Sequence, residues 1–312
     1  MDKKYSRKNV SGPIKGDKRR VYLIDASIYI FRAYYSIPDD VTNAVGEPIN
    51  ALHGFAGFLA GFLQEVNPAH VAVVFDESLT TSFRNDIYPA YKANRETPPD
   101  DLKQQFGWCR QLIEALGLPG FSSDRFEADD LIGTLAARLR SKGFAVVILS
   151  ADKDLAQLLE ADDMVWDYAR NRKHRHADIR KWLGVEAHQV ADWLALAGDT
   201  VDNIPGVPGI GAKTAAALLE KFESLERLYT ELDAVPESGL RGAARIHGLL
   251  AEHEDTARLA RQLTEIAIDP DLQVGIRDVQ RCKVNANALA AVCDELGLGR
   301  MTQARLLKVI NM

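Results

Sequence analysis

The sequence predicts an α/β fold, in which a mainly parallel central sheet is flanked by helices, followed by a helical C-terminal region. Two observations support this class. Short runs rich in β-branched residues alternate with longer helical patterns up to about residue 185, and beyond that point the strand pattern stops. The chain has 312 residues, 46% hydrophobic and 26% charged, which is typical of a globular protein with one large or two smaller domains.

Each expected strand is a short apolar run, rich in branched side chains, of the kind that is buried in a parallel sheet. The expected strands are residues 21–25, 71–76 and 145–150. The expected helices are residues 50–66, 101–116 and 128–142. We therefore divide the chain into a basic tail (1–20), an α/β domain (21–185) and a helical region (186–312).

The charge of the chain is unevenly distributed. Residues 1–20 hold eight basic and two acidic residues, a charge of +6, while the whole chain has −6, so the rest carries −12. We expect the tail to be a solvated arm, with added attraction to nucleic-acid phosphates as the alternative. The acidic excess of the body suggests carboxylates that hold divalent cations.

The cysteines and the hydropathy pattern bear on the cellular compartment. Cys109, Cys282 and Cys293 are scattered, which argues against a disulfide framework and against a zinc site. No apolar run has the length of a membrane span, and the N-terminus lacks the apolar core of a secretory signal. We expect a monomeric cytoplasmic protein that does not contact a membrane.

Acidic residues follow the predicted strands at the edge where open α/β sheets bind ligands. Four of them follow strand ends, three lie in Glu127-Ala-Asp-Asp130 at the start of a helix, and two lie in Gly198-Asp-Thr-Val-Asp202. Within the helix, Asp129 and Asp130 point about 100° apart. The nine residues are Asp25, Asp76, Glu127, Asp129, Asp130, Asp152, Asp154, Asp199 and Asp202.

Each of these acids alone has a simpler interpretation as a helix cap, a turn residue or a partner of the helix dipole. Nine carboxylates at one edge would repel each other strongly unless they were compensated. Hard divalent cations compensate such a group, and the lack of His and Cys favours Mg²⁺ or Mn²⁺ over Zn²⁺. Two such ions about 4 Å apart activate water and stabilise the leaving oxygen in phosphoryl transfer.

Two other segments carry candidate binding residues. Residues 77–100 fit neither a strand nor a strong helix, and a connection of this length is typically functional or mobile. Residues 203–215 are rich in glycine, but Ala212 interrupts the P-loop pattern and no strand precedes it. We predict a helix-hairpin-helix over residues 203–222, whose backbone amides bind phosphate without reading the bases; a plain Gly-rich link is the alternative.

Together these motifs resemble the 5′-nuclease family, which includes the 5′-3′ exonuclease domain of bacterial family A DNA polymerases, phage 5′-exonucleases and flap endonucleases. Alanine occupies positions 26 and 151, where the family usually has glycine. The given sequence ends at residue 312, so we expect a stand-alone member without a polymerase segment. The resemblance runs from residue 21 to at least 270 and rests on residues 23–34, 74–76, 91–95, 127–130, 151–154 and 198–215.

The resemblance implies a PIN/5′-nuclease-like fold and a structure-specific 5′-3′ exonuclease or flap endonuclease that uses two Mg²⁺ ions, replaceable by Mn²⁺. Residues 77–100 correspond to the family's helical arch, which clamps a single-stranded 5′ end. The acids assigned to the first ion are Asp25, Asp76, Glu127, Asp129 and Asp130. Those assigned to the second are Asp152, Asp154, Asp199 and Asp202.

The resemblance also implies roles for basic and aromatic residues. Lys92 and Arg95 match residues that act on the scissile phosphate. Arg32 and Arg84 match supporting phosphate contacts, and Tyr91 matches an aromatic that stacks on a base. The predicted hairpin would bind duplex DNA and hold K⁺ through backbone carbonyls; its DNA-binding residues are Gly206, Gly209, Gly211, Lys213 and Thr214.

Two rival functions share part of this pattern. A DNA-structure binder without cleavage would not need the nine acids together with Lys92 and Arg95. A ribonuclease on a related acidic α/β fold is disfavoured by the predicted hairpin, although RNA in the 5′ strand is compatible with the sequence. The preference for exonuclease or flap cleavage, the partner proteins and the role of residues 276–312 stay open at this point.

Overall fold

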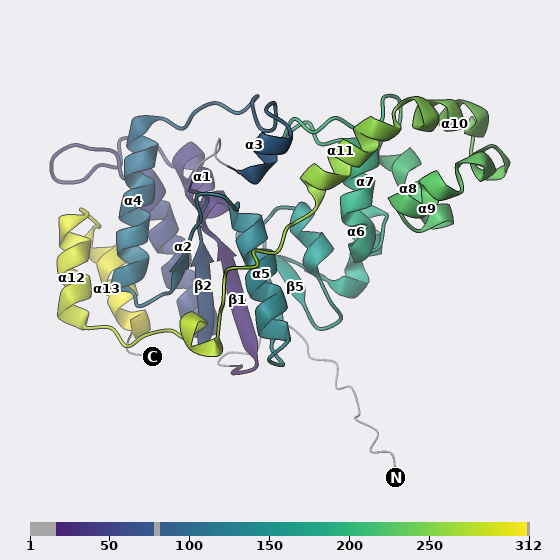
Figure 1. Cartoon of the computed structure of the whole chain (residues 1–312). Coiled ribbons are helices and arrows are strands. Elements are labelled where there is room, and N and C mark those ends of the chain that lie inside the picture. Colours follow the sequence, from purple (N-terminus) through teal and green to yellow (C-terminus); the bar gives the residue numbers. More distant parts are fainter. Residues whose placement is uncertain (1–16, 78–81, 311–312) are drawn as a thin grey trace, which may run out of the picture.

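A six-stranded sheet forms the centre of the computed structural model, which describes residues 17–77 and 82–310 (Figure 1). The strand order is β3-β2-β1-β4-β5-β6; β1 to β5 are parallel and β6 is antiparallel to β5. This confirms the predicted fold class. Most of the predicted tail lies outside the described residues. The strands are β1 (Arg20–Asp25), β2 (His70–Val74), β3 (Gly120–Phe121), β4 (Ala145–Leu149), β5 (Met164–Asp167) and β6 (Arg172–Arg175).

The three predicted strands are β1, β2 and β4, and they occupy the middle of the sheet. Their side chains alternate between two cores: Val21 and Leu23 lie in one, Tyr22 and Ile24 in the other. We did not predict β3, β5 and β6. They have two to four residues, and β6 is the basic run Arg-Lys-His-Arg at the sheet edge, where charged residues discourage further strand pairing.

One face of the sheet is covered by α2 (Asn50–Val66) and α4 (Asp100–Ala115), with α1 (Ala26–Ser36) packed against α2. Two C-terminal helices, α12 (Ala286–Glu295) and α13 (Arg300–Ile310), pack on α4 and α2 (Figure 1). Leu289, Cys293 and Leu306 bury their side chains in this core. The C-terminal segment therefore completes the core of the α/β domain.

The other face is covered by α5 (Ala128–Arg140), whose residues Ala128, Ile132, Leu135 and Leu139 lie on one stripe and face the sheet. The same core continues into the helical region on the right of Figure 1. The helices of that region are α7 (Val190–Ala197), α8 (Ala212–Phe222), α9 (Leu225–Thr230), α10 (Ala243–Glu252) and α11 (Glu254–Thr264).

The strand order reverses between β1 and β4, because β2 lies on one side of β1 and β4 on the other. Ligands of open α/β sheets bind at such a point, beyond the carboxyl ends of the strands. We call this end of the sheet the carboxyl edge; it lies toward α1 and α3 (Phe83–Ile87) at the top of Figure 1.

Among the described residues, no helix has the length and apolar character that a membrane crossing requires.

The remaining short helices connect the larger elements. The short helices are α6 (Ile179–Leu183), η1 (Asp154–Leu158), η2 (His176–Asp178), η3 (Ala187–Gln189), η4 (Leu232–Glu237) and η5 (Ile276–Val279).

Candidate active site

The carboxyl edge brings together acids from separate strands. Asp25 ends β1 and Asp152 follows β4. The Ser150 hydroxyl donates to Asp25 Oδ2 at 2.8 Å and accepts from the Asp152 amide at 3.0 Å, so it ties the two strand ends together. Ser150 was not among the predicted site residues; its position between a strand and the Asp152 motif was the only sequence signal.

Burial and mutual repulsion raise the pKa of these acids. Burial raises the pKa of Asp25 to about 7, with a further rise from the charge of Asp76. Burial and the charges of Asp152 and Asp25 raise the pKa of Asp129 well above its usual value. Burial and Asp152 raise the pKa of Asp154 to about 7. Such shifts indicate that these carboxylates are stabilised when they bind protons or a cation, because either offsets their mutual repulsion.

Two of the acids also cap helices, as the simpler interpretation suggested. Asp25 caps α1 and accepts from the Ile28 amide at 3.5 Å. Asp76 Oδ1 accepts from the Ala128 amide at 2.8 Å, at the start of α5. These contacts fix the two carboxylates at the carboxyl edge, because each carboxylate is held by a helix that packs on the sheet.

Asp129 and Asp130 are neighbours on α5 but have different surroundings. Asp130 is fully buried, and its carboxylate accepts from Arg84 Nη1 at 2.7 Å and from Arg84 Nη2 at 2.8 Å. It also accepts from the amides of Glu127 and Ala267. Within the described residues, by contrast, we find no hydrogen-bond donor to the Asp129 carboxylate. Both Asp130 oxygens are thus engaged by a buried arginine, which argues against the prediction that Asp130 binds a metal.

Arg84 is 2% exposed, and each of its five N–H groups has an acceptor. Besides Asp130, the guanidinium donates to Glu127 Oε2 and to the carbonyls of Leu263 and Glu265. The predicted phosphate contact of Arg84 is therefore corrected. The residue joins α3, α5 and the end of α11 inside the protein, which spacing along the chain could not reveal.

Tyr91 is likewise buried, with 4% of its surface exposed. Its hydroxyl donates to Glu127 Oε2 at 2.9 Å, and its ring belongs to the core beneath α5. The prediction that Tyr91 stacks on a base is corrected, because the ring faces the protein interior. Tyr91 instead positions Glu127.

Residues 88–95, which we call the basic turn, place two cations against the acids. Lys92 Nζ donates to Glu127 Oε1 at 2.7 Å and lies 3.8 Å from Asp202 Oδ2, and Arg95 donates to Asp202 Oδ1. Burial alone would lower the pKa of Lys92, but the neighbouring carboxylates raise it. In its described part, the predicted arch segment 77–100 contains the short helix α3 and this turn.

The loop between α7 and α8 brings in the last two acids. Asp199 Oδ2 accepts from Lys153 Nζ at 2.7 Å, and Lys153 Nζ also lies 3.2 Å from Asp154 Oδ1. Although burial opposes the change, these contacts lower the pKa of Asp199. Lys153 thus joins the two acid groups; its place between two predicted metal-binding aspartates was the sequence signal for it.

The acids suit a cation, although no three His, Cys, Asp or Glu side chains in the described part of the chain could hold a metal ion as they stand. The Asp129 carboxylate accepts no hydrogen bond in that part of the chain, and its pKa is raised well above the usual value. Oxygen ligands of this kind are those that Mg²⁺ prefers. In this structure Lys92, Arg95 and Lys153 supply part of the positive charge.

Outside the acids, Arg32 is exposed on α1, and its Nη1 lies 3.9 Å from Asp167 Oδ1. The predicted hairpin lies between α7 and α8. Gly209 has a φ of +82°, which favours glycine, whereas Gly211 is extended and has open space where a side chain would be. Lys213 is exposed and Thr214 half-buried in the first turn of α8.

Gly206 has an internal role. A Cβ at this position would lie 2.3 Å from the amide nitrogen of Gly198 and 2.4 Å from the carbonyl carbon of Ala197. The two glycines therefore bring two stretches of backbone into contact. The absent side chain of Gly206 thus makes room for the protein's own backbone, and its predicted contact with DNA stays a prediction.

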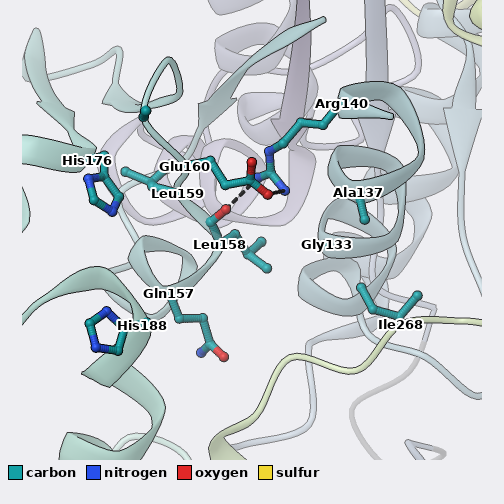
Figure 2. A pocket seen from close by; sticks show the side chains of 11 residues that line it. Gly133, Ala137, Arg140, Gln157, Leu158, Leu159, Glu160, His176, His188 and Ile268 are labelled. Atoms are coloured by element: carbon teal, nitrogen blue, oxygen red, sulfur yellow. Dashed lines mark hydrogen bonds and ion pairs between the residues drawn. The ribbon is translucent and has the colours of Figure 1, made fainter. Parts of the chain in front are cut away.

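A cavity of about 550 Å³ lies away from the acids, between α5, η1 and the segments that carry His176 and His188 (Figure 2). Its lining includes none of the nine predicted acids. Arg140, which borders it, donates to Glu160 and to the Leu158 carbonyl. The cavity offers no paired acids or free cation for phosphoryl transfer, so the candidate active site is the carboxyl edge.

Several known proteins are similar to this chain in sequence. The chain is 40% identical to DNA polymerase I of Rhizobium leguminosarum over 277 residues, which are 85% of this chain and 26% of that protein. It is 34% identical to a 5′-3′ exonuclease of Buchnera aphidicola over 258 residues, 83% of this chain and 85% of that protein. The chain thus spans about a third or less of the DNA polymerase I relatives.

Solved structures show the same fold. The flap endonuclease of bacteriophage T5, in a pseudo-enzyme–product complex with DNA and metal ions, matches with a TM-score of 0.64 at 19% identity, covering 94% of this chain and 100% of that one. The catalytic core of Rad2 in complex with DNA substrate matches with a TM-score of 0.64 at 14% identity, covering 94% and 92%. Both matches extend over the α/β domain and the helical region.

The family models cover most of the chain. One, described as 5′-3′ exonuclease, N-terminal resolvase-like domain, matches residues 20–184. The second, described as 5′-3′ exonuclease, C-terminal SAM fold, matches residues 185–287. This chain therefore belongs to the 5′-3′ exonuclease family.

Proposed function

We propose that this protein is a structure-specific 5′-nuclease that hydrolyses DNA phosphodiester bonds near a free 5′ end with two divalent cations. The observation that supports the proposal most is that a group of carboxylates and two basic side chains lie together at the carboxyl edge. Asp25 and Asp129, whose pKa is raised, lie at the same edge as Glu127 and Asp202. Glu127 and Asp202 pair with Lys92 and Arg95, which come from a segment distant in sequence. Metal ions and phosphate oxygens are the partners that these two sets favour.

The metal ions, the basic side chains and the carboxylates would each have a distinct role in cleavage. Bound Mg²⁺ or Mn²⁺ would supply an activated water and stabilise the leaving oxygen. Lys92 and Arg95 would neutralise the non-bridging oxygens of the scissile phosphate, and exposed Arg32 would orient a neighbouring phosphate. The carboxylates that would hold the first ion are Asp25, Asp76, Glu127 and Asp129, and those that would hold the second are Asp152, Asp154, Asp199 and Asp202.

The hairpin would bind the duplex part of the substrate independently of base sequence. The backbone at Gly209 and Gly211 is exposed, and the first amides of α8 point out beside Lys213, which suits a phosphate. Backbone carbonyls of the same turn would hold K⁺. Two structural relatives, the T5 flap endonuclease and the catalytic core of Rad2, were solved in complexes with DNA, which supports DNA as the partner.

Cleavage should depend on a divalent metal. We expect the protein to cut an end-labelled 5′-flap or nicked DNA with Mg²⁺ or Mn²⁺ and to lose this activity in EDTA. Blunt DNA and a flap with an RNA 5′ strand, run in parallel, define the preferred substrate. Undiminished cleavage in EDTA would exclude the metal mechanism, and binding without cleavage would identify a DNA-structure binder.

Divalent metal should also stabilise the fold, more so at high pH. Folding raises the pKa of Asp25 and Asp154 from 3.8 to about 7. Their stabilising contribution is therefore complete below about pH 4 and is lost as the pH rises through about 7. Because a metal binds the deprotonated acids, we expect Mg²⁺ to raise the melting temperature more at about pH 8 than at about pH 6. An equal rise at both pH values, measured by thermal unfolding, would contradict this.

Two glycine variants separate folding from DNA contact in the hairpin. Gly211→Ala should leave the melting temperature unchanged, because nothing lies within 4 Å of the added methyl group, and should weaken duplex binding by obstructing the phosphate. Gly206→Ala should instead destabilise the helical region, because its methyl would overlap backbone. Gel-shift titration and thermal unfolding measure both effects. Unchanged duplex binding by Gly211→Ala would remove this part of the hairpin from the interface.

A further inference from the structure

We infer that Asn203 is a positioning residue, which holds the basic turn so that Lys92 reaches the acids. This inference rests on the proposed function. Asn203 follows Asp202 in the loop between α7 and α8, and its side-chain Nδ2 donates to the Ala90 carbonyl at 2.6 Å. It therefore connects the loop that carries two acids with the segment that carries the proposed catalytic cations.

Three hydrogen bonds involving main-chain carbonyls join these two segments. Besides the bond from Asn203, the Lys92 amide donates to the Asp202 carbonyl at 2.9 Å, and Asn94 Nδ2 donates to the Thr200 carbonyl at 2.8 Å. The bonds from Asn203 and Lys92 are reciprocal, since each segment donates to the other. Asn94 is exposed, whereas Asn203 is half-buried, so water competes less for the Asn203 bond.

The backbone at both ends of this connection has an uncommon conformation. Lys92 has a φ of +55° and Asn203 a φ of +55°. This region is strained for lysine, whereas asparagine tolerates it better. Such conformations persist where surrounding contacts hold them. The bond from Asn203 to Ala90, two residues before Lys92, is one of those contacts, so its loss should let the turn relax.

The loop itself is already fixed at its base. Asp199 and Ile204 exchange two backbone hydrogen bonds, from the Asp199 amide at 3.0 Å and from the Ile204 amide at 2.8 Å. The Asn203 side chain is therefore not needed to close the loop. The alternative is that Asn203 is present only because asparagine accepts a positive φ. A glycine at 203 distinguishes the two, because it accepts the same φ without a side chain.

The experiment compares Asn203→Gly with Asn67→Gly in the full chain. Asn67 also has a positive φ, of 46°, but it lies at the end of α2, near the opposite edge of the sheet. We expect Asn203→Gly to lower the single-turnover cleavage rate about tenfold or more. The Kd for flap DNA in Ca²⁺ should change by less than about threefold. Asn67→Gly should keep the wild-type rate.

Two further measurements test whether Asn203 acts through Lys92. In the metal-free protein, amide hydrogen exchange of residues 90–95 should be faster in Asn203→Gly than in wild type, because the Ala90 carbonyl loses the donor that holds the turn against the loop. In a double-mutant cycle, Asn203→Gly should cause no further loss of rate once Lys92 is alanine. Asn203→Asp should be at least as slow as the glycine variant, because a carboxylate would face the Ala90 carbonyl.

The inference is overturned if Asn203→Gly cleaves at the wild-type rate. That result would mean that asparagine stands at position 203 only because it accepts a positive φ. It is also overturned if the rate losses of Asn203→Gly and Lys92→Ala add, or if Kd rises in proportion to the loss of rate. A wild-type protein without metal-dependent cleavage would reject the proposed function instead, while the exchange of residues 90–95 would still report on the connection itself.

Discussion

Replacement of Lys92 by alanine is expected to lower the single-turnover cleavage rate about a hundredfold or more, while the Kd for DNA changes much less. The side chain is largely buried and lies 2.7 Å from Glu127, so it belongs to the acidic site and is not a mobile surface charge. A preorganised cation at the reacting phosphate acts on the transition state, whereas a surface lysine contributes only screened attraction.

Lys92→Arg is the matched control for charge. It should restore the rate only partly, because a planar guanidinium does not replace a compact ammonium in a closely packed position. Rapid-quench measurements at saturating enzyme give the rate, and gel shifts in Ca²⁺ give the Kd. A Lys92→Ala enzyme that cleaves at nearly the wild-type rate once saturated would show that Lys92 only helps to hold DNA.

We expect the same substitution, aspartate to asparagine, to have opposite effects on activity and stability at two adjacent positions. Asp129→Asn should lower the cleavage rate about a hundredfold or more, because it removes a proposed metal ligand. It should not destabilise the metal-free protein, since the Asp129 charge is repelled by Asp152 and Asp25. Asp130→Asn should destabilise the fold by about 3 kcal/mol or more, because it leaves the buried Arg84 guanidinium without its main partner.

Urea unfolding in EDTA measures the stability of both variants, and single-turnover cleavage measures their activity. Because the two substitutions are identical and the positions adjacent, helix propensity and side-chain size cancel in the comparison. If Asp129→Asn were the destabilised variant, its carboxylate would have a structural role. If Asp130→Asn were stable but inactive, Asp130 would return to the proposed metal ligands.

The sequence by itself determined the class of fold and the location of the site. The runs at β1, β2 and β4 are apolar on both faces, so they could only be buried strands, and the acids after them had to meet at one edge. The resemblance to the 5′-nuclease family implied that Lys92 and Arg95 act at the same site. The short strands β3, β5 and β6 escaped prediction, because two to four residues carry too little periodicity.

Only the tertiary structure decided what each polar residue does within that site. Arg84 and Tyr91 look like solvent-facing ligand contacts in sequence, yet the structure buries both against Glu127. The direction of a side chain on an irregular segment depends on which distant element packs over it, here α5 and the end of α11. On α5, too, the direction of the side chain decides its role. Asp129 and Asp130 point about 100° apart. The Asp129 carboxylate therefore faces the acidic site, whereas the Asp130 carboxylate is neutralised by the buried Arg84.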